Sequence, residues 1–140
     1  MTRLVVPFPV RADRAFAYLA DPRNRPAWQS SLRSVADVRG AEQDPAASGV
    51  TWTDVTVVPG LRPRMRTTTS QAPRRWVEEG VWGPVTATLA LDLEDTAAGC
   101  RVLADFRVRA LGLGGPVTLL ARRAVTADLR RAARLVADAD

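Results

Sequence analysis

Two segments in the second half of the chain alternate strictly between apolar and polar side chains. Successive side chains of a β-strand point to opposite faces of a sheet, so a period of two predicts strands with one dry and one wet face. The segments are 84–94 and 100–110, with dry positions at Val85, Ala87, Leu89, Leu91 and Leu93 in the first, and Val102, Ala104, Phe106 and Val108 in the second. The sequence DTAAG between them is typical of a hairpin turn, which makes the pair antiparallel.

Five further segments predict strands, and in two of them polar side chains share a face with apolar or aromatic ones. The segments are 3–10, 31–39, 50–58, 62–72 and 75–82. The first contains two prolines, which confine it to a sheet edge or a strand end. In the fourth, Met65 and Thr67 share one face and arginines occupy the other; in the fifth, Glu78 shares a face with two tryptophans.

Three segments predict helices. Asp13 is expected to cap a short helix over residues 13–20, and a second short helix is expected over 22–29, where proline is acceptable in the first turn. After a glycine-rich turn, Pro116 begins a long helix that runs to about Asp138, with apolar residues at helical spacing and arginines mostly on the other side.

The order of these elements predicts an α+β fold. One strand, two short helices, a run of strands and one long helix make a single domain over residues 1–140, with a curved antiparallel sheet of about six or seven strands around the C-terminal helix. The dry face of such a sheet is larger than one helix can seal. A cavity between sheet and helix is the expected result.

The composition excludes several kinds of site. The chain has no histidine and one cysteine, so it lacks the commonest general base, the commonest metal ligand and any internal disulfide; we expect no metal and no cofactor. The single cysteine and the absence of a secretory or membrane-spanning segment predict a cytoplasmic protein without membrane insertion. The net charge of +5 comes from arginines spread among acidic residues, which favours a solvated surface over specific nucleic-acid binding.

Three residues are weak candidates for catalysis. Tyr18 is the only tyrosine, and a structural role is the stronger interpretation for it. Asp54 either lines a pocket or pairs with an arginine on an adjacent strand, and pairing is favoured because a buried acid needs a partner. Glu78 points into the pocket if its neighbouring tryptophans do, but a solvated position is favoured for both Glu78 and Glu79 because exposed glutamate is usual.

Several stretches of the chain resemble a known superfamily. The order is PVRADRAFAYLADPRNRPAWQ, then GVTWTDVTVVPG, APRRWV and GCRVLADFRVRA, followed by a glycine-rich turn and a long helix. This pattern resembles the START-like, helix-grip proteins of the SRPBCC superfamily, in the group described as polyketide cyclase/dehydrase-like. The resemblance covers nearly the whole chain and implies the fold more strongly than any activity, because members include lipid carriers, hormone receptors, aromatases and cyclases.

The resemblance and the periodicity together predict a binding protein for a small hydrophobic or aromatic ligand, lipid-like or polyketide-like. The expected lining residues are Trp52, Met65, Thr67, Trp76, Trp82, Leu89, Phe106, Leu120 and Ala124. One alternative is a metal-free cyclase or aromatase acting on a polyketide-like substrate, which works by folding its substrate. The other is an accessory interaction protein that uses the arginine-rich surface of the long helix. A homodimer is compatible with the sequence, although no residue argues for it.

Overall fold

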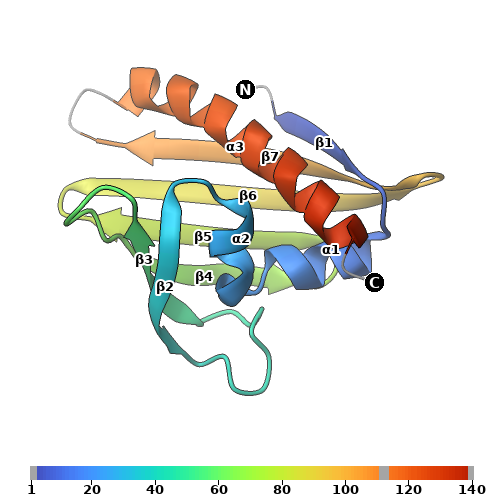
Figure 1. The fold of residues 1–140 in the computed structure, drawn as a ribbon, viewed down its shortest axis with the longest axis horizontal. Coiled ribbons are helices and arrows are strands. Elements are labelled where there is room, and N and C mark those ends of the chain that lie inside the picture. Colours follow the sequence, from blue (N-terminus) through green and yellow to red (C-terminus); the bar gives the residue numbers. More distant parts are fainter. Residues whose placement is uncertain (1–2, 111–113, 139–140) are drawn as a thin grey trace.

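The computed structural model describes residues 3–110 and 114–138, with side chains of the long helix described from residue 122 onward. Seven strands and four helical segments follow one another in the predicted order (Figure 1). The strands are β1 (Leu4–Phe8), β2 (Leu32–Arg39), β3 (Thr51–Thr56), β4 (Arg64–Gln71), β5 (Arg75–Trp82), β6 (Val85–Thr96) and β7 (Gly99–Arg109). The helices are α1 (Ala12–Leu19), the single 3₁₀ turn η1 (Pro22–Asn24), α2 (Arg25–Trp28) and α3 (Gly114–Asp138).

All seven strands belong to one antiparallel sheet with the order β1-β7-β6-β5-β4-β3-β2. Each consecutive pair from β2 to β7 is hydrogen-bonded in sequence, and only β1 crosses to the far edge beside β7. Gly99 opens β7 where the chain passes close to β1, and a Cβ at that position would overlap the carbonyl oxygen of Phe8. This close approach explains a glycine at the end of the β6–β7 hairpin.

One face of the sheet carries the hydrophobic core, as the alternation predicts. Leu91 and Leu93 of β6 and Val102 and Ala104 of β7 are buried, whereas their polar neighbours in sequence lie on the other face. The long helix α3 crosses this face over β1 and β7 and also contacts α1 and α2 (Figure 1). No helix in the described part of the chain is long and apolar enough to cross a membrane.

The inner side of α3 carries small and branched apolar side chains. Leu129, Ala132 and Val136 are buried at helical spacing, while Arg130 and Arg134 are exposed on the opposite side. The guanidinium of Arg14, in α1, donates to the Val136 carbonyl oxygen over 2.9 Å and ties the end of α3 to α1. These contacts fix the C-terminal half of the helix against the sheet.

The first short helix is capped by a residue from a distant part of the sequence. We expected Asp13 to cap this helix, but Asp13 lies inside its first turn and the residue before the helix, Arg11, offers no side-chain cap. Instead Asp95, at the end of β6, accepts from the Ala12 amide over 2.9 Å and pairs with Arg11. The second predicted helix, 22–29, is divided into η1 and α2, and Asp21 accepts from the Arg23 amide at its start.

Removing the Asp95 carboxylate should therefore destabilise the protein by about 1 kcal/mol, the usual effect of losing a helix N-cap. We expect Asp95→Ala to lower the free energy of unfolding by this amount in urea denaturation. Asp13→Ala is the control: among the described residues Asp13 accepts one hydrogen bond, from the neighbouring Arg14 amide, so its loss should have the smaller effect. A larger loss in Asp13→Ala would contradict the assignment.

Candidate ligand cavity

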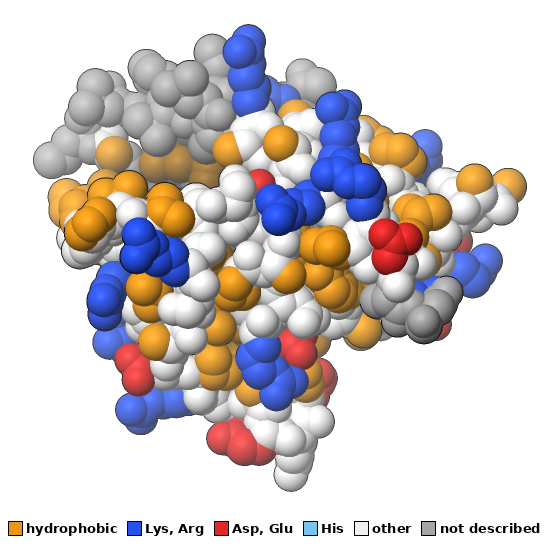
Figure 2. Space-filling model, viewed as in Figure 1, with side chains coloured by type: hydrophobic (Ala, Val, Ile, Leu, Met, Phe, Trp, Pro, Cys, Tyr) orange, Lys and Arg blue, Asp and Glu red, His pale blue; other side chains and the backbone are white. Residues whose placement is uncertain are grey.

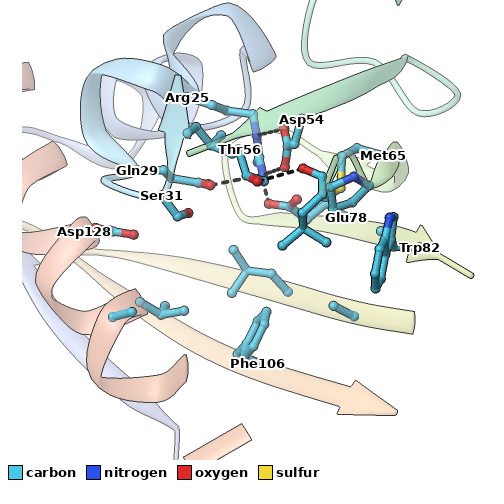
Figure 3. Close-up of a pocket in the computed structure, with 18 of the residues that line it drawn as sticks. Arg25, Gln29, Ser31, Asp54, Thr56, Met65, Glu78, Trp82, Phe106 and Asp128 are labelled. Atoms are coloured by element: carbon cyan, nitrogen blue, oxygen red, sulfur yellow. Dashed lines mark hydrogen bonds and ion pairs between the residues drawn. The ribbon is translucent and has the colours of Figure 1, made fainter. Parts of the chain in front are cut away.

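A cavity of about 300 Å³ lies between the inner face of the sheet and helices α2 and α3 (Figure 3). Its apolar walls come from β4, β6, β7 and α3, and Trp82 stands at its edge with 47% of its surface exposed. Apolar lining residues include Trp28, Leu32, Met65, Val85, Ala87, Leu89, Phe106 and Val125. The sheet therefore leaves an unfilled apolar space beside the covering helix, in the position that the fold analysis predicts.

The polar end of the cavity is a buried cluster around Arg25, which α2 places over the sheet (Figure 3). The Arg25 guanidinium donates from Nε and Nη2 to the two oxygens of Asp54 over 3.2 and 3.0 Å, and from Nη1 to Oε1 of Glu78 over 2.7 Å. A fourth hydrogen bond, from Nη2, reaches Gln29 over 3.3 Å. Arg25, Asp54 and Glu78 are 2%, 5% and 3% exposed. We call these three residues the Arg25 cluster.

Two stacked tryptophans support the Arg25 cluster from the core. Trp52 and Trp76 lie with ring centroids 6.5 Å apart and planes 14° from parallel. The Trp52 indole donates to Oδ1 of Asp54 over 2.9 Å, and the Arg25 guanidinium carbon lies 5.1 Å from the Trp52 ring centroid. The indole thus holds both Asp54 and Arg25 in place through a hydrogen bond and a cation–π contact.

The Arg25 cluster contains two carboxyl groups for one guanidinium, and this arrangement affects the protonation of Arg25 and Glu78. Burial acts to lower the pKa of Arg25, but the Glu78 and Asp54 carboxylates outweigh it and raise that pKa, so Arg25 stays charged. Burial raises the pKa of Glu78, and Arg25 reduces this rise without cancelling it because the guanidinium also serves Asp54. The second oxygen of Glu78, Oε2, makes no hydrogen bond with any described residue, and Glu78 lines the cavity.

The raised pKa of Glu78 predicts a pH dependence of stability. An acid that binds its proton more tightly in the folded protein loses stabilising free energy as pH rises from its unfolded-state pKa of about 4.3 upward. We therefore expect the free energy of unfolding of the wild type, relative to Glu78→Gln, to decrease with increasing pH in urea titrations. Glu79→Gln, which changes the adjacent exposed carboxyl, should not show this trend. A relative stability that increases with pH would contradict the raised pKa.

A further carboxylate reaches the cavity from α3. Asp128 accepts from both the amide and the hydroxyl of Ser30, over 3.3 and 3.1 Å, and this pair joins α3 to the segment after α2. Burial raises the pKa of Asp128, while the two hydrogen bonds from Ser30 and the charge of Arg131 act against the rise. Figure 3 shows Asp128 on the α3 side of the residues drawn, away from Glu78 on the sheet.

Five of the predicted lining residues lie around the cavity, and three lie elsewhere in the core. Met65, Trp82, Leu89, Phe106 and Ala124 line it. Trp52, Thr67 and Trp76 are buried in the core outside this lining. The inner face of the sheet extends beyond the cavity. The alternation of apolar and polar residues identifies that face, but it does not show which part of the face is packed with core side chains and which part borders the cavity. The Leu120 side chain lies outside the described residues.

The three candidates for catalysis also fall in different places. Tyr18 is half-buried on α1, away from the cavity, where burial raises the pKa of its hydroxyl. Asp54 lines the cavity and pairs with an arginine, although that arginine comes from α2 and not from a neighbouring strand. The expectation that Glu78 is solvated was wrong, because its strand turns it inward beneath Arg25; Glu79 is exposed as expected.

Sequence reasoning missed Arg25, Gln29 and Asp128. A usable signal existed for Arg25: it lies three residues before Trp28 in a predicted helix, and residues at this spacing share a face. A tryptophan in such a short helix usually packs into the core, so an arginine on the same face would turn inward too and need carboxylate partners. Within the described residues, no group of three potential metal ligands is placed to hold a metal ion.

A curved antiparallel sheet that holds an apolar cavity beneath a C-terminal helix defines a helix-grip protein. This chain belongs to the family described as polyketide cyclase / dehydrase and lipid transport, whose model matches residues 2–139. The sequence matches no curated protein.

Solved structures share the fold at low sequence identity. MLL2253 from Mesorhizobium loti has a TM-score of 0.77 at 10% identity, over 99% of this chain and 98% of that one. NE0264 from Nitrosomonas europaea has a TM-score of 0.73 at 13% identity, over 99% and 94%. DynU16, a protein from the dynemicin biosynthetic locus, has a TM-score of 0.71 at 16% identity; the match covers 99% of this chain and 48% of DynU16.

Proposed function

We propose that this chain binds a compact apolar or aromatic molecule in the cavity beside α3. The observation that carries the proposal is an apolar space of about 300 Å³ that ends at the Arg25 cluster. Ligand sites combine mostly hydrophobic walls with a few fixed polar groups that orient the guest, and this cavity has that composition. Membership of a family that includes lipid transport supports the same proposal.

The size of the cavity favours a compact guest over a long acyl chain. Ligand pockets in proteins span about 300–1,000 Å³, and this one lies at the lower limit of that range. Aromatic and thioether side chains surround it, namely Trp28, Trp82, Phe106 and Met65. Such side chains pack well against a flat ring system.

Filling the cavity tests the proposal directly. Ala87, on β6, lines the cavity, whereas Ala90 on the same strand points to the other face. We expect Ala87→Phe to weaken binding of the neutral probe naphthalen-2-ylmethanol by at least about tenfold, because the added ring occupies space that the probe needs. Isothermal titration calorimetry and the fluorescence of the tryptophans at the cavity both measure the affinity.

Ala90→Phe is the matched control, since it adds the same ring to the same strand outside the cavity. We expect it to bind the probe like the wild type. Equal binding by the Ala87→Phe variant, or no binding by the wild type, would overturn the proposal. Native mass spectrometry of the protein purified from its own host would then identify the natural guest as a bound mass that Ala87→Phe loses.

A second function, cyclisation of a polyketide-like substrate, is favoured by one observation. Glu78 is a buried carboxyl group with a raised pKa that lines the cavity, and its Oε2 makes no hydrogen bond with any described residue. A carboxylic acid in that position would polarise the carbonyl oxygen of a folded substrate. The test is product formation from a short poly-β-ketone with the wild type and Glu78→Gln. Activity lost in the variant while probe binding persists would favour the enzyme.

The arginine-rich surface gives less support to an interaction protein. Arg123, Arg130, Arg131 and Arg134 are exposed on α3. Figure 2 shows blue side chains close together over α3, with others scattered singly among hydrophobic and uncharged side chains. Charged side chains on an exposed helix face usually solvate that face.

A further inference from the structure

We propose that the guest carries a positive charge: an apolar, preferably aromatic, molecule with an ammonium group that binds the carboxylate of Glu78. This inference rests on the proposed binding function and names the chemical class of the ligand. Three features of the cavity support it: the balance of charges in its lining, the engagement of Arg25 by Asp54 and Glu78, and the position of Glu78 beside apolar side chains of the sheet.

The charged groups around the cavity are predominantly negative. Among the described lining residues, the ionisable side chains are Arg25, Asp54, Glu78 and Asp128, which makes three carboxyl groups for one guanidinium. The whole chain carries a net charge of +5, so the cavity differs in sign from the surface. A ligand that enters this space meets the local groups, because surface charges are screened by water and salt while buried ones are not.

The one cation in the described lining is already engaged. Arg25 donates four hydrogen bonds, three of them to the oxygens of Asp54 and Glu78. A carboxylate or phosphate ligand would have to take this guanidinium from partners that are themselves buried. Removing the partner of a buried charge is strongly unfavourable, so the cluster discriminates against anions.

The Arg25 cluster instead lacks a second cation. Asp54 accepts from the Nε and Nη2 edge of the guanidinium through both its oxygens, and Glu78 accepts from Nη1 through one oxygen only. An ammonium group at Oε2 of Glu78 would supply the missing positive charge and a charge-assisted hydrogen bond. Burial raises the pKa of Glu78 although Arg25 acts against the rise, which agrees with two carboxyl groups sharing one guanidinium.

The sheet register places an apolar surface directly beside this carboxylate. Glu78 on β5 pairs with Leu89 on β6, and Leu89 pairs with Phe106 on β7. The three side chains therefore form one row across the inner face, and all three line the cavity. A molecule anchored at Glu78 through its ammonium group would lay its apolar body over Leu89 and Phe106, toward α3 (Figure 3).

Three probes with the same ring system and different polar groups test the inference. They are naphthalen-2-ylmethylamine, naphthalen-2-ylmethanol and naphthalene-2-carboxylate, titrated at pH 7.5 into the full chain by calorimetry. We expect the ammonium probe to bind about tenfold more tightly than the alcohol, the difference between a charge-assisted and a neutral hydrogen bond. The carboxylate should bind more weakly than the alcohol.

Glu78→Gln should remove the preference for the ammonium probe, so that the amine and the alcohol bind with similar affinity. Glu79→Gln is the matched control, because it removes one negative charge from the adjacent exposed position on the same strand. It should keep the wild-type order of affinities. The alcohol also reports whether the Glu78→Gln cavity is intact, and the order of the three probes on the wild type does not depend on any variant.

The outcomes separate the two proposals. If the alcohol binds and the carboxylate binds as tightly as the ammonium probe, the cavity accepts guests but the inference about charge is wrong. If the preference for ammonium persists equally in Glu78→Gln, the assignment to this carboxylate is wrong. If none of the three probes binds, the proposed function itself fails.

Discussion

Replacing Arg25 with alanine is expected to lower the free energy of unfolding by about 3–5 kcal/mol, the range found when one partner of a buried ion pair is removed. The substitution would leave two buried carboxyl groups, Asp54 and Glu78, without the guanidinium that lies between them. Urea denaturation followed by tryptophan fluorescence measures the loss. The deficit should shrink at low pH, where Glu78, whose pKa burial already raises, accepts a proton and the repulsion in the cluster falls.

The matched control is Arg23→Ala, two residues earlier in the same segment. Arg23 forms a hydrogen-bonded ion pair with Asp21, but its side chain is exposed. We expect no measurable change in the denaturation midpoint, because exposed ion pairs contribute little. Similar losses in both variants, or a deficit in Arg25→Ala that does not depend on pH, would show that the Arg25 cluster is not the cause.

A third variant asks why a buried ionic cluster is present at all. Replacing Arg25, Asp54 and Glu78 together with apolar side chains of similar size should recover much of the stability, since hydrophobic replacements of buried ion pairs are often neutral or stabilising. The same variant should lose its preference for the ammonium probe. Recovery of stability without that preference would indicate that the cluster serves recognition more than folding.

The strands of this protein could be predicted from the sequence because their signal is local. In β6 and β7 the type of each residue, apolar or polar, indicates the face of the sheet on which it lies. The burial of residues such as Leu91 and Val102 therefore follows directly from the period of two. The long helix is also predicted from a local signal: after the glycine-rich segment, the spacing of apolar residues changes from two to that of a helix. These elements needed no information about their neighbours.

The Arg25 cluster could not be predicted as a unit because its members come from α2, β3 and β5. Considered separately from the sequence, Asp54 was expected to have an arginine partner on an adjacent strand and Glu78 a solvated position, because these are usual for acidic residues. Burial of Glu78 becomes acceptable only once Arg25 is seen above it, and the sequence around Glu78 does not show that an arginine from α2 lies there. The helix cap from Asp95 was missed for the same reason, since it reaches α1 from the distant end of β6.

The tryptophans of β5 also show that the local sequence does not reveal the surroundings of a side chain. Their replacement is the second substitution for which we expect a large effect. Trp76 and Trp82 lie on the same strand and the same face, yet Trp76 is 1% exposed and stacked on Trp52 whereas Trp82 is 47% exposed at the edge of the cavity. From the alternation of residues along β5, both tryptophans were predicted to contact the ligand. Their environments predict opposite consequences when each is replaced by alanine.

Trp76→Ala should lower the free energy of unfolding by about 3–5 kcal/mol, because it opens a large hole in the core and removes the ring on which Trp52 packs. Trp82→Ala should change stability by no more than about 0.5 kcal/mol, as is usual for exposed positions. It should nevertheless weaken binding of naphthalen-2-ylmethanol severalfold, since the indole covers the edge of the cavity. Urea denaturation and calorimetry on the same two variants give both quantities.

The two substitutions control for each other, because each removes one indole from β5. The proposal is supported if each variant changes a different quantity: Trp76→Ala loses stability, and Trp82→Ala loses affinity for the probe while remaining fully folded. If Trp82→Ala binds the probe like the wild type, the guest does not reach the edge of the cavity where this indole stands. If Trp76→Ala retains wild-type stability, the stacked pair does not hold Asp54 and Arg25 in place, and the buried charges must be fixed by their mutual attraction alone.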